Sequence, residues 1–265
     1  MKQQYIYLGR PVSYSLHGKG QKLILLHGFG ETASVWREIV NDLSKDYEVL
    51  VPDIPGSGDS PAIDDMTMDG LATAVHALAS SLGWKKYVLI GHSMGGYISL
   101  AYADLFPAAL NALGLFHSTA YADSEEKIST RKKGIQFIKD NGAAAFLRST
   151  TANLFAPETK KQRPELIDRI VASGTGFSEE VLISYYEGMI QRPDRTHILS
   201  QVPYPVLIIM GKYDQAVPVK DNLQLCKLPK VAYIHTLFQS GHMGMLEETQ
   251  RSISILRQFM ADLSQ

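Results

Sequence analysis

Cysteine is almost absent from this chain of 265 residues, which contains only Cys226. A single cysteine cannot form an internal disulfide, and it excludes a cysteine-rich metal site. Cys226 ends the segment 222–226, whose apolar spacing predicts an amphipathic helix. We therefore expect a packed, unreactive thiol rather than a nucleophile.

An excess of charge of either sign is also missing. The chain has 26 basic and 27 acidic residues, and its net charge of -1 provides no general attraction to nucleic acid or anionic lipid. The first residues lack the apolar core of a signal peptide, and no apolar run is long enough to span a bilayer. These absences predict a cytoplasmic protein that contacts neither nucleic acid nor membrane. The sequence does not indicate the oligomeric state.

What the chain does contain is an alternation of apolar runs with amphipathic segments. Continuous apolar runs indicate strands that are covered on both faces, and the segments between several of them show helical spacing. This alternation predicts an α/β fold with a parallel sheet flanked by helices. Residues 118–200 show only helical segments, so we expect one sheet domain with a helical insertion. The predicted strands are residues 5–8, 12–16, 23–26, 47–51, 87–90, 113–116, 205–210 and 231–237.

The segment 88–97 carries the first chemical signal. It reads as an apolar strand, then Gly-His-Ser-Met-Gly centred on Ser93, then the start of a helix. A Gly-x-Ser-x-Gly turn between strand and helix projects the serine from the backbone, and its glycines let the two elements approach closely. Ser93 is therefore a candidate nucleophile, although a five-residue pattern alone is weak evidence.

An acid and a base follow Ser93 in an order that suits a catalytic triad. Catalytic groups in parallel sheets gather at the carboxyl ends of the strands. Asp214 lies in a tight turn after the predicted strand 205–210, and His242 lies in a glycine-flanked loop before the last predicted helix. The chain order Ser, Asp, His matches one known arrangement of the triad. Asp53, in a Gly-rich loop, is more simply interpreted as a brace for that loop.

Five segments together resemble the α/β-hydrolase family over nearly the whole chain. They are His27-Gly28 with Trp36 downstream, Asp53-x-Pro-Gly56-x-Gly58-x-Ser60, Gly91-His92-Ser93-Met94-Gly95-Gly96, Gly211-x-x-Asp214-x-x-x-Pro218, and Gly241-His242. The resemblance implies an eight-stranded, mostly parallel sheet flanked by helices. It also implies that residues 1–118 and 199–265 form this core and that residues 119–198 form a helical cap.

The same resemblance implies roles for individual residues. Ser93 would be the nucleophile, His242 the general base and then acid, and Asp214 the group that orients the imidazole. The backbone N–H groups of Phe29 and Met94 would form the oxyanion hole, and no metal or organic cofactor is implied. The candidates for the pocket lining are His27, Gly28, His92 and His117. A structural role in shaping the oxyanion loop is the alternative for His27, and a purely packed role is an equal alternative for His117.

These residues predict a serine hydrolase that cleaves a small, mostly apolar carboxylic ester through an acyl-enzyme intermediate. Two alternatives stay open: a carbon–carbon bond hydrolase or lyase that uses the same three residues, and a non-catalytic receptor of the same fold. The sequence does not identify the substrate, because specificity would depend on the helical insertion. Apolar and aromatic residues available there are Phe137, Phe146, Leu147, Phe155, Tyr185, Tyr186 and Met189.

Overall fold

A computed structural model of the protein describes residues 2–263 and contains a sheet of eight strands. The strand order is β1-β2-β4-β3-β5-β6-β7-β8; β2 pairs antiparallel with β1 and β4, and the other pairings are parallel. The predicted fold class, a mostly parallel eight-stranded sheet flanked by helices, is confirmed. The strands are β1 (Lys2–Tyr7), β2 (Arg10–His17), β3 (Gln21–Leu26), β4 (Tyr47–Pro52), β5 (Tyr87–His92), β6 (Leu110–Phe116), β7 (Val206–Gly211) and β8 (Ala232–Leu237).

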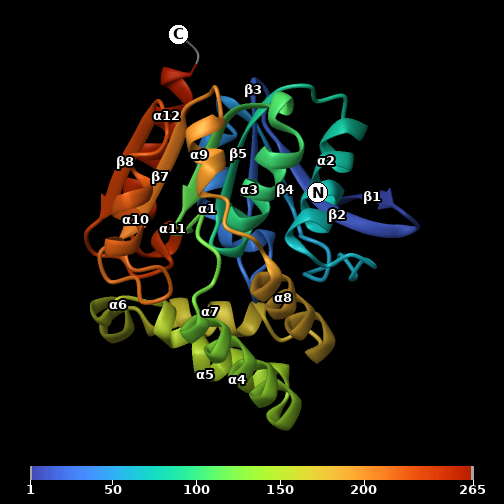
Figure 1. Ribbon diagram of the computed structural model, residues 1–265, viewed down its shortest axis with the longest axis vertical. Coiled ribbons are helices and arrows are strands. Elements are labelled where there is room, and N and C mark those ends of the chain that lie inside the picture. Colours follow the sequence, from blue (N-terminus) through green and yellow to red (C-terminus); the bar gives the residue numbers. More distant parts are fainter. Residues whose placement is uncertain (1, 264–265) are drawn as a thin grey trace.

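Helices cover both faces of this sheet (Figure 1). Helices α2 (Met68–Ser81) and α3 (Met94–Leu105) pack on one face, and α1 (Arg37–Leu43) and α12 (Thr249–Asp262) pack on the other. Successive strand residues point to opposite faces, so Leu23 packs with one layer and Ile24 with the other. Because both faces are apolar and covered, polar side chains on the central strands gather at the strand ends.

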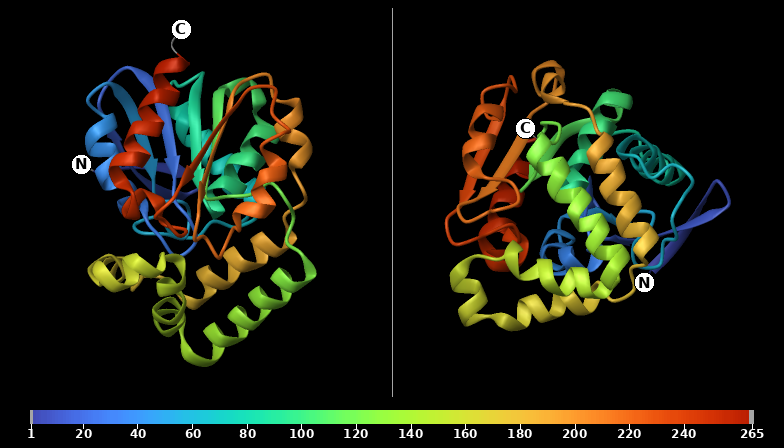
Figure 2. Two further views of the ribbon diagram at one scale, coloured as in Figure 1. Left: turned by 90° about the vertical axis from the view of Figure 1, so that its left-hand side faces the viewer. Right: turned by 60° about the horizontal axis from the view of Figure 1, so that its bottom comes forward.

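Residues 118–205 contain helices and no strand, as the sequence pattern predicts. Most of these helices lie together across the carboxyl ends of the parallel strands, as the lower part of Figure 1 and both views of Figure 2 show. The division into core and cap stays a prediction, and its boundary at residue 198 falls within α9. The helices are α4 (Glu125–Asn141), α5 (Ala143–Thr151), η3 (Ala152–Leu154), α6 (Pro157–Gln162), α7 (Pro164–Ser173), α8 (Glu179–Gln191) and α9 (Thr196–Gln201).

Two helical segments differ from what the sequence pattern predicts. The apolar spacing of residues 33–45 predicts one helix, but this segment begins as the 3-10 helix η1 (Ala33–Trp36) and continues as α1. The last predicted helix, residues 247–263, corresponds to α12, and the unpredicted short helix α11 (Gly244–Glu247) precedes it. Glu248, which has non-helical backbone angles, separates the two. The Glu248 carboxylate accepts the Gln239 N–H at 2.8 Å and the Ser240 hydroxyl at 2.7 Å, which ties the break to the preceding loop.

The remaining short elements are η2 (Pro107–Ala109) and α10 (Val219–Leu225), the second of which ends just before Cys226. Cys226 is half-buried, and its Sγ donates to the Asn222 carbonyl oxygen at 3.4 Å. Within residues 2–263, no helix combines the length and the apolar character needed to cross a membrane.

Candidate active site

Ser93 lies at the sharp turn between β5 and α3. Its φ of 51° and ψ of -116° place it in a region that non-glycine residues rarely adopt. The Ser93 N–H donates to the Phe116 carbonyl oxygen at 3.0 Å, so the turn is held by the neighbouring strand β6. The strained backbone presents the serine side chain at the carboxyl edge of the sheet.

Three glycines make room for this turn. A Cβ on Gly91 would collide with the backbone of Gly95, and a Cβ on Gly96 would collide with the side chain of Ser118. A Cβ on Gly95 would lie 2.6 Å from the His27 carbonyl oxygen, which belongs to the loop after β3. The close approach that the sequence motif predicts is therefore present on both sides of Ser93.

Asp214 and His242 are joined at the same edge of the sheet. Asp214 Oδ2 accepts a hydrogen bond from His242 Nδ1 at 2.7 Å, and both side chains are buried. Asp214 Oδ1 accepts the N–H groups of Ala216 and Val217, each at 2.8 Å. Burial opposes ionisation of Asp214, but the adjacent imidazole rings of His242 and His117 outweigh it and lower the pKa of this carboxyl. Asp214 is thus a fixed negative charge behind the His242 ring.

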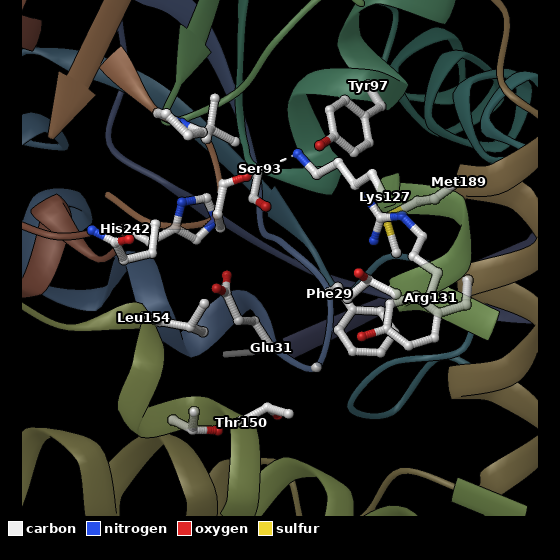
Figure 3. Close-up of a pocket in the computed structure, with 18 of the residues that line it drawn as sticks. Phe29, Glu31, Ser93, Tyr97, Lys127, Arg131, Thr150, Leu154, Met189 and His242 are labelled. Atoms are coloured by element: carbon white, nitrogen blue, oxygen red, sulfur yellow. Dashed lines mark hydrogen bonds between the residues drawn. The ribbon is translucent and has the colours of Figure 1, made fainter. Parts of the chain in front are cut away.

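Ser93 and His242 both reach into a cavity of about 430 Å³ between the sheet edge and the helices (Figure 3). Within residues 2–263, no hydrogen bond joins the Ser93 hydroxyl to the His242 ring. Such contacts are often long in a free site and tighten when a substrate binds. The structure therefore brings the three predicted residues to one site and leaves open space beside the serine.

The two predicted oxyanion donors also lie at this site. Phe29, in the loop after β3, lines the cavity, and Met94 is the first residue of α3. In the described chain, neither the Phe29 N–H nor the Met94 N–H donates a hydrogen bond. The amide groups at a helix N-terminus favour a negative charge. Two backbone donors are therefore available to a ligand oxygen near Ser93.

Glu31 and His92 form a buried bridge that the sequence interpretation missed. Glu31 Oε2 accepts the Gly28 N–H at 2.7 Å and lies 3.0 Å from His92 Nδ1. The other ring nitrogen, His92 Nε2, donates to the His242 carbonyl oxygen at 2.9 Å. Both nitrogens of the His92 ring face acceptors, which fits a protonated imidazole. The bridge links the loop after β3, the end of β5 and the loop of His242.

Opposite charges stabilise the two ends of this bridge. Burial opposes protonation of His92, but the Glu31 carboxylate outweighs it and raises the pKa of the ring. Burial likewise opposes ionisation of Glu31, and the His92 charge and hydrogen bond lower its pKa. The available sequence signal was an acidic residue in an apolar, glycine-containing loop directly after a buried strand.

His117 is packed behind Asp214. Its backbone has a positive φ of 49°, and its Nδ1 lies 3.3 Å from Asp214 Oδ2 without the alignment of a hydrogen bond. Two glycines accommodate the ring: a Cβ on Gly211 would lie 2.6 Å from His117 Cε1, and one on Gly244 would collide with Nε2. Burial lowers the pKa of His117 to about 4, although Asp214 acts in the opposite direction. The ring is therefore neutral at ordinary pH.

None of the four residues expected to line the pocket is on the wall of this cavity. His27, Gly28, His92 and His117 are all buried behind it. The His27 ring accepts the Ile54 N–H at 3.0 Å and contacts Ser57 Oγ at 2.8 Å. It therefore links the loop after β3 to the loop after β4. The physical reason is common to the three histidines, whose rings turn inward against polar groups of neighbouring loops.

The helical insertion contributes three of its predicted residues to the cavity wall, which are Leu147, Tyr186 and Met189. Phe146, Phe155 and Tyr185 are instead buried in the core, and Phe137 is partly exposed. The insertion also contributes two cations that the sequence interpretation missed, Lys127 and Arg131.

Asp53 has the bracing contacts expected of it. Its carboxylate accepts the Ala33 N–H at 2.9 Å and pairs with Lys2 Nζ at 2.9 Å. A different trio among the described residues has the spacing to hold a metal, because atoms of His117, Asp214 and His242 lie within 4.8 Å of one another. The direct hydrogen bond between Asp214 and His242 uses atoms that a metal would need, and it orients the imidazole for proton transfer.

Comparisons with known proteins find similar sequences and a similar fold among hydrolases and esterases. The sequence profile of the alpha/beta hydrolase fold matches residues 22–128. The chain is 24% identical to a 2-hydroxy-6-oxononadienedioate/2-hydroxy-6-oxononatrienedioate hydrolase from Paraburkholderia phymatum, over 94% of this chain and 90% of that protein. It is 23% identical to a pimeloyl-[acyl-carrier protein] methyl ester esterase from Methylococcus capsulatus, over 92% and 96%. A malate-bound thermophilic esterase from Thermogutta terrifontis superimposes with a TM-score of 0.93 and 24% identity, covering 99% of both chains.

Proposed function

The chain belongs to the alpha/beta hydrolase family of enzymes, and from this premise we propose that it is a serine hydrolase that cleaves a carboxylic ester. The observation that carries the proposal is the hydrogen bond of 2.7 Å between Asp214 and His242, with His242 and the strained Ser93 in one cavity. A carboxylate, an imidazole and a projecting hydroxyl are the groups that acyl transfer by a serine requires.

The proposed reaction proceeds in two steps. His242 takes the proton of the Ser93 hydroxyl while the Ser93 oxygen attacks the ester carbonyl. The N–H groups of Phe29 and Met94 stabilise the resulting oxyanion. His242 then gives the proton to the leaving alcohol, which produces an acyl ester of Ser93. Water activated by His242 hydrolyses this ester and frees the acid. Asp214 holds the required tautomer of His242 and stabilises its charge throughout.

In this proposal residues 119–198 act as a cap that closes the substrate cavity. The support is that α4, α5, α7 and α8 supply wall residues opposite the sheet edge. A cavity of about 430 Å³ suits a small-molecule substrate. In this arrangement the helices would determine which substrate binds, and the residues at the sheet edge would carry out the reaction.

A second candidate reaction is hydrolysis of a carbon–carbon bond. The observation that favours it is the match over 94% of the chain to the Paraburkholderia hydrolase described above, which is named for dienedioate and trienedioate substrates. The same serine, histidine and aspartate would serve that reaction. Parallel assays with methyl or aryl esters and with a dienoate substrate distinguish the two candidates.

Labelling with a fluorophosphonate probe tests the proposed nucleophile. We expect stoichiometric labelling of the wild-type protein and none in Ser93→Ala, which should keep its fold by circular dichroism and lose at least about 10⁴-fold in ester turnover. Ser129→Ala, at an exposed serine of α4, is the matched control and should be labelled like the wild type. A folded wild-type protein that is not labelled, or activity retained in Ser93→Ala, would contradict the proposal.

A further inference from the structure

Two basic residues of α4 point into the cavity that holds Ser93. Lys127 and Arg131 are four residues apart, which places them one above the other on one face of the helix. Figure 3 shows both side chains reaching into the cavity on the side of Ser93 that lies away from His242. The cavity thus has Ser93 and His242 at one end and the positively charged side chains of Lys127 and Arg131 at the other.

Arg131 is held rigidly in this position. Its Nε and Nη2 donate to the Asp123 carboxylate at 2.5 and 3.3 Å, and its side chain is only 12% exposed. Its guanidinium also lies 5.4 Å from the centroid of the Tyr186 ring. In the described chain its third nitrogen, Nη1, makes no hydrogen bond, so it keeps donors free at the cavity wall.

The ring beneath Arg131 connects it to the oxyanion loop. Tyr186 stacks on Phe29 with ring centroids 4.5 Å apart and an interplanar angle of 7°. Arg131, Tyr186 and Phe29 therefore form a continuous part of the cavity wall that runs from the charged end to the loop of the proposed oxyanion donor.

The positive charge at this end is not balanced by the acids around it. Asp123 is shared between Arg131 and Arg192, whose Nη2 lies 2.9 Å away. Burial opposes ionisation of Asp123, but the two guanidinium groups outweigh it and lower its pKa. Lys127 Nζ donates to the Ala216 carbonyl oxygen at 2.8 Å and forms no ion pair within residues 2–263. Asp123 therefore pairs with two guanidinium groups, and Lys127 adds a third positive charge that, in the described chain, is hydrogen-bonded only to a neutral carbonyl.

The other acids on the cavity wall do not supply the missing charge. Glu31 is already paired with His92, and Glu126 and Asp221 are exposed to solvent, which screens them. The packing of α4 explains why Arg131 contacts Asp123 and why Lys127 contacts the Ala216 carbonyl. It does not explain why N–H donors without a partner in the described chain face the cavity. Among the described residues, Arg131 shares its only acid with Arg192, and the partly buried Lys127 has none, so a ligand that provides negative charge would be stabilised at this wall.

We propose that Lys127 and Arg131 bind a carboxylate carried by the substrate, at the end of the cavity away from His242. The inference rests on the proposed ester hydrolysis at Ser93 and specifies its substrate class: an ester whose acyl or alcohol part ends in a second, free carboxylate. Arg131 binds that group through its free guanidinium donors, and Lys127 adds a point charge. This revises the mostly apolar substrate expected from the sequence.

Two matched pairs of esters test the proposal. Monomethyl adipate and methyl hexanoate differ by a carboxylate at the end of the acyl part, and 6-acetoxyhexanoate and hexyl acetate differ by one in the alcohol part. We expect the wild-type enzyme to prefer the charged member of at least one pair by about tenfold or more in kcat/KM. In Arg131→Met and Lys127→Met this ratio should fall several-fold, and in the double variant it should approach one.

The ratio is measured within each variant, so a general loss of activity does not affect it. Arg131→Lys should retain part of the preference, because it keeps the charge. Lys132→Met removes an exposed charge from the next position of α4 and should keep the wild-type ratio. Equal kcat/KM values within both pairs for the wild type, or an unchanged ratio in the double variant, would overturn the carboxylate site while leaving the serine hydrolase intact. Failure of the proposed function would instead appear as no turnover of any ester and no labelling of Ser93.

Discussion

The cavity wall at the edge of the sheet and the wall formed by α4 and α8 hold their polar side chains in different ways. On the sheet side, Ser93 on the wall and Asp214 and His117 behind it each follow a buried strand within three residues, and the pairing of these strands fixes their positions. On the helical side, Arg131 and Tyr186 are held by an ion pair and by ring stacking. The sheet edge therefore fixes the positions of the reacting atoms, whereas the helices determine the shape and charge of the space that the substrate occupies.

This difference predicts unequal consequences of mutation on the two walls. A group fixed by strands has few ways to relax, so its loss should impair the reaction strongly. A group held by side-chain contacts between helices is different, because neighbouring side chains can shift to fill its place. Its loss should therefore change the affinity for substrate by a smaller factor.

After the loss of the nucleophile in Ser93→Ala, the largest expected effect is that of Asp214→Asn on the sheet side. The asparagine oxygen can still accept the N–H groups of Ala216 and Val217, so we expect the turn to persist. Its amide nitrogen would face His242 Nδ1 and favour the tautomer that carries the proton on Nε2, which cannot accept one from Ser93. We expect kcat to fall by about 10³- to 10⁴-fold with little change in the melting temperature.

Asp140→Asn is a matched control for that substitution, because Asp140 is exposed on α4 and does not line the cavity. Its steady-state kinetics should equal those of the wild type. A loss of less than tenfold in Asp214→Asn would show that the carboxylate does not orient the base, and the distinction between the two walls would weaken.

The sheet wall was largely predictable because its signals are local. Apolar runs, together with the alternating pattern of residues 12–16, identified all eight strands, and the residues that follow the strands identified Ser93, Asp214 and His242. The bounds of β1 and β6 were less accurate, because their outer residues do not form apolar runs. The short helices α6 and α9 were not predicted, since six residues carry too little periodicity to separate a helix from a turn.

The polar contacts across the site were not predictable, because they join residues far apart in the chain. The His92 ring was expected at the pocket, yet it pairs with Glu31, which is 61 residues away, and with the carbonyl of His242, which is 150 away. On the helical wall, Lys127 and Arg131 have the same sequence signature as the exposed Lys132 beside them. Only the packing of α4 shows which of these cations enters the cavity.

A pH-dependent effect should distinguish the buried sheet edge from the solvated surface. The pKa of His117 in the folded protein is about 4, below its ordinary value of 6.5. Between pH 6.5 and 4 the unfolded chain therefore binds a proton at this ring that the folded chain does not. Stability falls as the pH decreases through this window, by about 3 kcal/mol in total, and this contribution levels off below pH 4.

Urea unfolding of the wild type and His117→Asn between pH 7 and 4 measures this contribution. Asparagine tolerates the positive φ at this position and does not titrate. The free energy of unfolding should decrease less in the variant by about 3 kcal/mol over that range. Asp214, His92 and His242 face the ring and are common to both proteins. His197→Asn, at an exposed histidine, should follow the wild-type curve; equal slopes for all three proteins would contradict the buried, neutral ring.

The smallest effect is expected from Tyr186→Leu on the helical wall. This substitution removes the ring that lies between Phe29 and Arg131, but it leaves every proposed reacting group in place. An aromatic pair of this kind contributes about 1 kcal/mol beyond its buried area, so we expect kcat/KM to fall by about two- to tenfold, mainly through a higher KM. Tyr186→Phe keeps the ring and should behave like the wild type. A loss of 10³-fold concentrated in kcat would place Tyr186 with the reacting groups, and the helical wall would then contribute to the chemistry as well as to binding.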